Sequence, residues 1–396
     1  MNRNKMDPPG FIKNTWFSFS LLIFAVISLS YLTNGFWGNP PEREVEEEKF
    51  IVDLGLTVSA YGQVNNIPPP VLEKIFDLKQ ESDSAKNLSA FALSQDQLVK
   101  STRVELAQYI EEHSKNPTRF TIHFMVYLIF MAYLFFLMYH SQVSPAKQKL
   151  MYLAAIVIFG FGFNANPSPM GPVRDTIALF SNPDDIIHPR LFAILTFLVF
   201  VVVANKFICS WVCQLGVLQD LIFRINKAGK GRKVIFSQFK LPFFFTNTIR
   251  VAFFIIISAF STIWAFNLVK WIDPFNVFNP SVISLFGGIF IGLILLASLF
   301  VYRPWCHLFC PFGLLSWLLE KFSIFKIKVD YQTCTACNSC SEACPSNVME
   351  AILKGKKTVP DCFSCGTCIS ECPTDSVTFG KGRRHKLPPG FFTLEN

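Results

Sequence analysis

Residues 334–345 read CTACNSCSEACP, and residues 362–373 read CFSCGTCISECP. Both stretches follow one pattern, C-x2-C-x2-C-x3-C-P. Three thiolates at this close spacing can wrap a tight loop around one iron–sulfur cube, whereas the fourth lies too far along the chain and ligates the neighbouring cube. The spacing therefore predicts two 4Fe–4S clusters that exchange one ligand. Cluster I would be held by Cys334, Cys337, Cys340 and Cys372, and cluster II by Cys362, Cys365, Cys368 and Cys344.

Two other uses of cysteine fit this pattern less well. Structural zinc sites prefer paired C-x2-C knuckles at longer separation, and disulfide frameworks are typical of small secreted domains. Residues 326–380 instead resemble the dicluster bacterial ferredoxin module. That resemblance implies a small α+β domain at the C-terminus of the chain.

The rest of the chain is strongly apolar. Of its 396 residues, 51% are hydrophobic and 44 are Phe. Six stretches are long and uncharged enough to span, or nearly span, a bilayer, whose hydrocarbon core requires about 20 apolar residues of helix. They are residues 16–32, 120–139, 150–163, 191–204, 251–269 and 282–302. The sequence therefore predicts an all-α membrane protein of about six transmembrane helices that carries the small ferredoxin domain.

The runs at 150–163 and 191–204 are short for a membrane span. We expect both helices to continue past Asn164 and Asn205, with the charged ends of Lys149 and Lys206 reaching the membrane surface. Basic residues precede the first run, but no small-residue cleavage site follows it. The first run is therefore expected to be an uncleaved anchor rather than a signal peptide.

The distribution of basic residues predicts the orientation of these helices. The segment from Lys206 to Arg250 holds eight Lys or Arg residues against one acid, Asp220, whereas the loops of the alternate side carry about as many acids as bases. Both termini and all 12 cysteines are therefore expected on the cytoplasmic side of a bacterial inner membrane, where thiolates stay reduced. The net charge of +8 is assigned to this topology, and no basic patch interleaved with base-stacking aromatics indicates nucleic-acid binding.

These patterns divide the chain into five parts. Residues 1–36 form an N-terminal anchor, 37–119 an outer, periplasmic helical module, 120–325 a five-helix membrane domain, 326–380 the ferredoxin domain and 381–396 a basic tail. The outer module has helical patterns that begin near Pro70 and at Ser94. Nothing catalytic is visible in it, so it is interpreted as a folded spacer or as a docking surface for an outer partner. The tail is interpreted as a solvated end or as a contact for anionic lipid.

A duplicated unit lies inside the predicted membrane domain. One copy reads KFICSWVCQLG (residues 206–216) and the other RPWCHLFCPFG (residues 303–313). In each copy a basic residue lies three positions before the first cysteine, and a glycine lies three positions after the second. If the helix continues past the membrane surface, the two cysteines of a copy share one face. Both pairs would then emerge into the cytoplasm, where the four thiols could converge.

The pattern alone leaves three roles open for Cys209, Cys213, Cys306 and Cys310. They could ligate a metal or a third cluster. They could instead be reactive thiols that exchange electrons as disulfides, or they could only pack, since free cysteine is commonly buried.

Twin C-x3-C-P signatures after membrane helices, followed by a dicluster ferredoxin module, resemble the NapH/NosR family of ferredoxin-type membrane proteins. The resemblance covers residues 120–380 and departs from the family pattern at Gln214, where the first motif would have proline. It implies electron transfer between the quinone pool and iron–sulfur centres, serving a reductase or its maturation.

A quinol site would need a proton acceptor near the membrane surface. His123 and His140 lie within and at the end of the second predicted span, and His188 precedes Pro189 on the outer side. An ionisable residue inside a membrane is a functional candidate, although a histidine there also serves as a hydrogen-bond partner between helices. The chain has no C-x-x-C-H motif for haem attachment. Asp273 could cap the following turn or bind a quinone head group.

The leading hypothesis is a ferredoxin-type electron-transfer subunit. It would pass electrons between the quinone pool, or a cytoplasmic donor, and an unidentified reductase partner. The alternatives are an iron–sulfur maturation or regulatory factor for a metalloenzyme, and a cytoplasmic-side metal-ion reductase that uses the membrane thiols. The direction of electron flow cannot be read from the sequence because cluster spacing does not fix a reduction potential.

Overall fold

The structure is a computed structural model. It describes residues 9–37, 50–76, 117–179, 189–225, 237–264, 272–280, 283–356 and 358–388, and shorter pieces at 78, 84–91, 95, 97–99, 101–102, 105–106, 109 and 391. The chain divides into two compact units, one of residues 38–122 and one formed by the rest. His188, a candidate from the sequence, lies outside the described residues.

The smaller unit is helical where it is described. Its elements are α2 (Val58–Val64), α3 (Pro69–Phe76) and the 3-10 helix η2 (Leu88–Phe91). Thr57 caps α2 by accepting a hydrogen bond from the Ala60 amide. The described residues between 95 and 109 are also helical, as the sequence predicts, although Ser94 lies outside the description. The buried Tyr61 hydroxyl pairs with Thr102 at 3.0 Å, which ties this helical segment to α2.

Three helices of the larger unit are long and apolar enough to cross a membrane. They are α1 (Pro9–Trp37), α5 (Pro117–Tyr139) and α11 (Phe243–Trp264). Three further predicted spans form shorter helices, which are α6 (Pro145–Ala155) with the π-helix η3 (Ile156–Gly162), α8 (Pro189–Ala204) and α13 (Leu285–Ala297). The chain is therefore mostly helical with three candidate membrane spans among its described residues.

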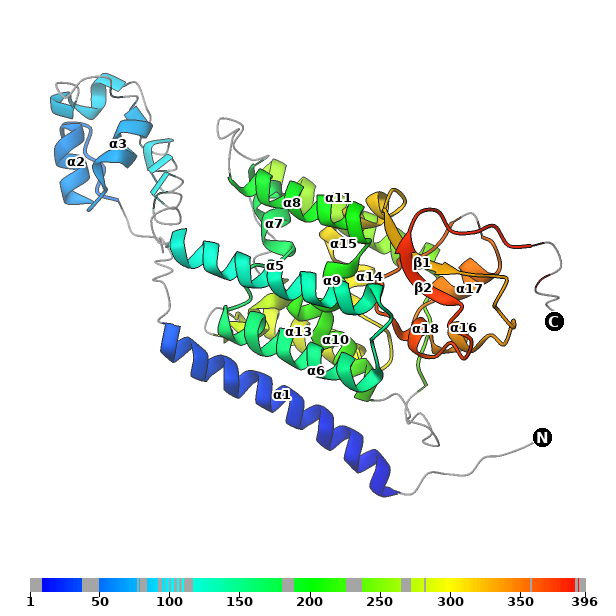
Figure 1. Cartoon of the computed structure of the whole chain (residues 1–396). Coiled ribbons are helices and arrows are strands. Elements are labelled where there is room, and N and C mark those ends of the chain that lie inside the picture. The colour runs from blue at the N-terminus through cyan, green and yellow to red at the C-terminus, as the bar shows by residue number, and fades with distance from the viewer. Residues whose placement is uncertain are drawn as a thin grey trace. The chain divides into compact units, whose positions relative to one another are not determined.

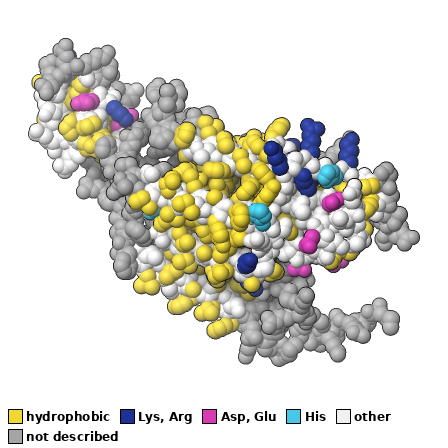
Figure 2. Space-filling model, viewed as in Figure 1, with side chains coloured by type: hydrophobic (Ala, Val, Ile, Leu, Met, Phe, Trp, Pro, Cys, Tyr) yellow, Lys and Arg dark blue, Asp and Glu magenta, His cyan; other side chains and the backbone are white. Residues whose placement is uncertain are grey.

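Large apolar side chains cover the outside of this helix bundle. Phe192 is 75% exposed, Phe244 84% and Leu285 85%. Figure 2 shows such side chains gathered on one broad face of the helices, while most of the charged side chains in view lie toward the C-terminal end. An apolar surface of this kind indicates hydrocarbon as its solvent.

The predicted extension of two helices is wrong. The helix α8 ends at Ala204, and Asn205 then adopts a left-handed conformation with φ of 61°. Lys206 does not reach a membrane surface, because its side chain is fully buried and paired with Asp361. On the other helix, η3 ends at Gly162, and Asn164 is also left-handed. In both cases a turn with positive φ stops the helix where an asparagine can adopt it.

Short helices fill the interior of the bundle. They are α7 (Met170–Leu179), α9 (Phe207–Trp211), α10 (Gln214–Ile225), the 3-10 helix η4 (Pro274–Phe278), α14 (Pro304–Leu308) and α15 (Pro311–Glu320). The pairs α9–α10 and α14–α15 are the two copies of the duplicated unit, and each pair turns at its second cysteine.

The C-terminal module, residues 325–388, is a small α+β structure at one end of the bundle (Figure 1). Its strands β1 (Phe325–Val329) and β2 (Val377–Lys381) pair antiparallel, with Phe325 opposite Lys381 and Val329 opposite Val377. Its helices are α16 (Ser339–Ala343), α17 (Val348–Leu353) and α18 (Thr367–Ser370). The module joins the bundle through the Ile324 amide, which donates to the Val202 carbonyl of α8 at 2.8 Å.

Candidate functional site

The eight cysteines of the C-terminal module line two separate cavities. Around the first lie Cys334, Cys337, Cys340 and Cys372. Around the second lie Cys344, Cys362, Cys365 and Cys368. Each cavity thus receives three thiols from one loop and the fourth from the other loop, which is the grouping expected for clusters I and II.

The two cavities differ in their surroundings. The first opens beside Cys337, the one exposed thiol among the described cysteines. Hydrogen bonds from Ser339 lower the pKa of the Cys337 thiol, which favours the thiolate that an iron atom requires. The second cavity is lined by Tyr302, which directly precedes the second copy of the duplicated unit. The second cavity therefore faces the bundle, and the first lies nearer the solvent.

Both cavities fit an iron–sulfur cluster better than a single ion. A zinc ion needs its four ligands about 2.0–2.3 Å from one point. Within the described residues, no three His, Cys, Asp or Glu side chains converge closely enough to hold a metal ion. The thiols surround a cavity instead of meeting at a point, and a cube-shaped cluster needs this wider arrangement. When bound, such clusters supply one-electron redox chemistry.

The exchange of one ligand between the loops gives a direct test. Cys372→Ser is expected to disturb the same cluster as Cys337→Ser, and Cys344→Ser the same cluster as Cys365→Ser. Each change should cost about four of the irons in the module. Iron and sulfide counting with electron paramagnetic resonance (EPR) would check it. Matching spectra for Cys344→Ser and Cys337→Ser would contradict the assignment.

The four cysteines of the duplicated unit converge inside the bundle. Every pair among Cys209, Cys213, Cys306 and Cys310 lies within electrostatic range of each other. Three of these thiols are buried and Cys310 is partly buried. We call this group the twin-cysteine site. Its convergence agrees with the prediction, but its position does not, because the thiols do not emerge beyond the bundle.

Each duplicated unit is a helical hairpin rather than the end of one continuous helix. Both ends of α9–α10 contact the C-terminal module, where Lys206 pairs with Asp361 and Arg224 donates to Thr367. At the turn of the hairpin, Gln214 donates to the Pro167 carbonyl at 3.1 Å, and Cys213 is in electrostatic range of Tyr127 on α5.

The second hairpin has the same form. Arg303, at its start, lies 5.0 Å from the ring of Phe363 in the C-terminal module. At its turn, Phe309 packs 5.4 Å from Phe253 near the middle of α11. The expectation of one helical face per cysteine pair is therefore wrong, because the helix breaks between the first and second cysteine of each copy.

The break places the second cysteine of each pair at the start of a new helix. The Gly313 amide donates to Cys310 Sγ at 3.3 Å, and the Gly216 amide donates to Cys213 in the same way. Backbone N–H groups at a helix N-terminus favour negative charge on sulfur. Gln214 occupies the first helical position that Pro311 fills in the other copy, so its departure from the family pattern leaves this geometry intact.

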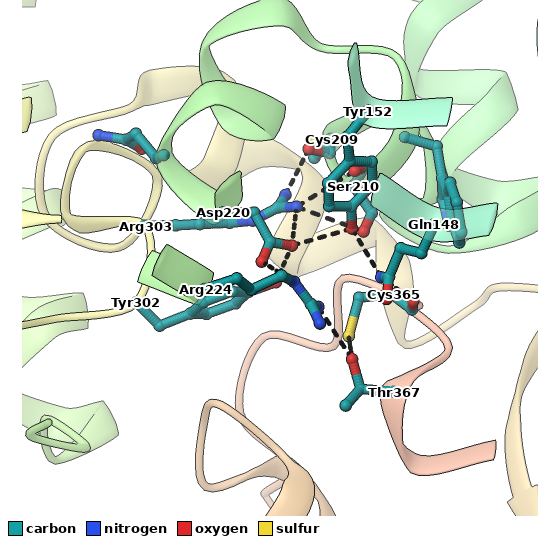
Figure 3. Close-up of polar contacts among 12 residues, drawn as sticks. Gln148, Tyr152, Cys209, Ser210, Asp220, Arg224, Tyr302, Arg303, Cys365 and Thr367 are labelled. Carbon is teal, nitrogen blue, oxygen red and sulfur yellow. Dashed lines mark hydrogen bonds and ion pairs between the residues drawn. The ribbon is translucent and has the colours of Figure 1, made fainter. Parts of the chain in front are cut away.

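Buried ion pairs connect the twin-cysteine site to the C-terminal module. In the first network, shown in Figure 3, Asp220 accepts hydrogen bonds from Arg303 at 2.8 Å and Arg224 at 2.6 Å. Tyr152 and Tyr302 also donate to Asp220, at 2.9 and 3.1 Å. Arg303 continues to the carbonyls of Cys209 and Ser210.

This first network extends to the loop that carries cluster II. Arg224 donates to Thr367 Oγ1 at 2.9 Å, and Gln148 donates to the Cys365 carbonyl at 2.8 Å. Trp211, between the cysteines of the first copy, donates to the Ser364 carbonyl at 3.0 Å. The ligand loop of cluster II is therefore fixed against the twin-cysteine site by polar contacts.

A second network lies on the other side of the same loop. Asp361, next to Cys362, pairs with Lys206 and with Arg250 at 2.8 Å. Burial opposes ionisation of Asp361, but these two cations outweigh it and hold its pKa below the usual range. Lys206 donates to the Gly313 carbonyl at 3.0 Å, and Arg250 donates to the Cys306 carbonyl at 3.3 Å.

The two networks surround the twin-cysteine site with positive charge. They contain Lys206, Arg224, Arg250 and Arg303 against the three carboxyl groups of Asp220, Asp361 and Glu320. Four thiolates around an iron–sulfur cube carry a net negative charge, which this excess of cations would stabilise. The sequence showed the basic residue before each cysteine pair, but it gave no indication of the distant acids that pair with these cations.

The remaining candidates from the sequence lie away from this site. His123 stacks on Phe163 at 3.9 Å between ring centroids, and His140 lies just after the end of α5. Asp273 caps η4 by accepting a hydrogen bond from the Phe275 amide at 3.0 Å. Of its two predicted roles, capping of the following turn is the one that the structure shows.

Comparison with known proteins agrees with both cysteine sets. A family model described as a 4Fe–4S dicluster domain matches residues 326–373. A second model, a 4Fe–4S binding domain, matches twice, at residues 187–235 and 283–330, and each match contains one cysteine pair of the twin-cysteine site.

Three curated relatives match part of this chain. YccM of Escherichia coli, to which electron transport is ascribed, is 28% identical over 39% of this chain and 45% of its own length. The ferredoxin-type protein NapH of Escherichia coli is 26% identical over 39% of this chain and 52% of its own. NapH of Haemophilus influenzae is 28% identical over 40% of this chain and 55% of its own length. The chain is similar to the NapH-type 4Fe–4S proteins.

The matches span only about half the length of these curated relatives. No solved structure matches the chain. These matches and the cysteine-lined cavities indicate an iron–sulfur protein, and three of its described helices are long and apolar enough to cross a membrane.

Proposed function

We propose that this NapH-type protein passes electrons between the quinone pool and a reductase partner through three centres in a row. Cluster I, cluster II and a third iron–sulfur cluster at the twin-cysteine site would form the row. The convergence of the four thiols of the twin-cysteine site beside the loop of cluster II is the observation that carries the proposal.

The order of the centres follows from their surroundings. The cluster I cavity lies beside an exposed thiol, where a partner on the same side as the module can approach. The cluster II cavity shares Tyr302 with the bundle. Between cluster II and the twin-cysteine site lies Phe363, with Lys206 5.5 Å and His307 5.2 Å from its ring centroid.

The membrane arrangement supports quinone as the other partner. We propose six helices across a bacterial inner membrane, with both termini and the C-terminal module in the cytoplasm. Ser30, in the second half of α1, donates to the Val277 carbonyl of η4 at 3.0 Å, as expected if both lie toward the outer side. The hairpin turns would then place the third centre at a depth that lipid-dissolved quinol can approach. Residues 37–119 would form a periplasmic module.

Iron counting tests the third centre. Anaerobically purified protein is expected to contain about 12 irons, and Cys306→Ser about eight with both ferredoxin-type EPR signals retained. Cys340→Ser, the matched control, should lose the cluster I signal instead. About eight irons in the parent protein, with no change in Cys306→Ser, would exclude a cluster at the twin-cysteine site.

Addition of a reduced menaquinone analogue tests the electron donor. Reduction of the clusters, followed by EPR, would support the quinone pool as a partner, and its loss in Cys306→Ser would place the third centre on the route. Clusters that the quinol analogue does not reduce, but that control the metal loading of a partner, would favour a maturation factor instead.

A further inference from the structure

Several fully buried side chains near the twin-cysteine site have polar atoms without a hydrogen-bond partner, and two of these atoms belong to residues that interact with its cysteines. They are the hydroxyl of Tyr127 on α5 and the amide nitrogen of Gln219 on α10. A buried donor without a partner is uncommon in proteins. Their position beside four thiols suggests what they serve.

Tyr127 reaches the site from a helix that contributes no cysteine. Its hydroxyl lies in electrostatic range of Cys213 and Cys209. Its ring is held between Phe159, 5.3 Å away, and Phe197, 6.1 Å away, both nearly edge-on. Packing therefore fixes the ring. The hydroxyl, which is the polar group of the side chain, is then available to donate a hydrogen bond to a cysteine sulfur.

Gln219 touches a different cysteine. Its amide oxygen lies 3.8 Å from Cys306 Sγ, and its amide nitrogen has no partner. A thiol donates its proton to such an oxygen. A thiolate bound to iron has no proton to donate and accepts instead, and a half-turn of the amide presents its N–H group to the same sulfur. The side chain therefore suits both states of the cysteine without any movement of the backbone.

We propose that Tyr127 and Gln219 donate hydrogen bonds to the cysteine sulfurs of the third centre and thereby raise its reduction potential. This inference rests on the proposed third cluster. Donors to sulfur stabilise the reduced state more, because reduction adds negative charge to the cluster, and hydrogen bonds to sulfur are a recognised determinant of cluster potential. Both residues act as positioning residues around the cluster rather than as ligands.

Redox titration followed by EPR tests the inference. Tyr127→Phe and Gln219→Met remove the donors with little change in volume. The matched controls are Tyr133→Phe, which is exposed on the same helix, and Gln142→Met at an exposed position. Each test variant should keep about 12 irons. Its third signal should titrate at a lower potential, the signals of clusters I and II should not move, and the double variant should shift further.

The outcomes separate this inference from the proposed function. If both test variants keep about 12 irons and the potential of the third signal does not shift, Tyr127 and Gln219 do not donate to the cluster, although the third cluster itself is present. Equal shifts of this potential in the control variants would also contradict the proposed role of the two donors. About eight irons in the parent protein would remove the third cluster itself, and the inference with it.

Discussion

Asp361→Asn is expected to reduce the free energy of unfolding by about 3–5 kcal/mol, the usual cost of leaving buried charges without their partner. Asp361 is 1% exposed, and both Lys206 and Arg250, which pair with it, have fully buried side chains. The asparagine cannot neutralise either cation. Because Asp361 joins the cluster II loop to the bundle, the C-terminal module should also detach more easily.

Thermal unfolding in detergent, with limited proteolysis of the C-terminal module, measures this effect. The matched control is Glu350→Gln in the same module. Glu350 pairs with Lys354 at 2.8 Å, but both side chains are about 40% exposed. An exposed pair of this kind contributes about 0–1 kcal/mol. Equal melting temperatures for the two variants would show that Asp361 does not hold the module in place.

Gly216→Ala and Gly313→Ala are expected to be the next most damaging changes. A Cβ at Gly216 would lie 2.6 Å from the Cys209 carbonyl oxygen, and one at Gly313 would lie 2.9 Å from that of Cys306. Both contacts are with backbone, which cannot turn aside as a side chain can. Forcing an extra methyl into a packed site costs about 1–3 kcal/mol. It would also displace the amides that donate to Cys213 and Cys310.

Gly292→Ala is the control for these variants. Nothing lies within 4 Å of a Cβ at Gly292, and the residue is inside α13. Alanine there should be neutral or stabilise the helix by up to about 1 kcal/mol. Melting temperature and iron content would be measured for all three proteins. Full iron content and an unchanged melting temperature for Gly216→Ala would contradict the close approach of the two helices.

The cysteine grouping could be predicted because it depends on local spacing. Three thiols within seven residues must share one loop, and the exchange of the fourth follows from its distance along the chain. The duplicated unit could also be predicted, since its copies have the same length and the same flanking residues. Whether the eight thiols ligate iron remains a prediction that the variants above address.

The position of the twin-cysteine site could not be predicted, because it depends on a break inside each copy. Residues 207–216 read as a plausible helix, and the sequence pattern alone does not show that the chain turns back at Cys213. The ion pairs were missed for a similar reason. Lys206 and Arg250 were counted with the basic residues that orient a membrane protein, whereas Asp361 lies 155 and 111 positions away from them along the chain.

The hairpins of the twin-cysteine site have an electrical consequence for the proposed chain of centres. The turn of the first hairpin lies near Tyr127, in the middle of α5, whereas the end of that hairpin at Arg224 contacts the loop of cluster II. With the helices placed across a membrane as proposed, an electron that moved between these positions would travel partly along the membrane normal and cross part of the transmembrane voltage. A full crossing is worth about 2.3 kcal/mol per 100 mV for one elementary charge. The equilibrium between the deepest centre and the other two would therefore respond to the energised state of the membrane.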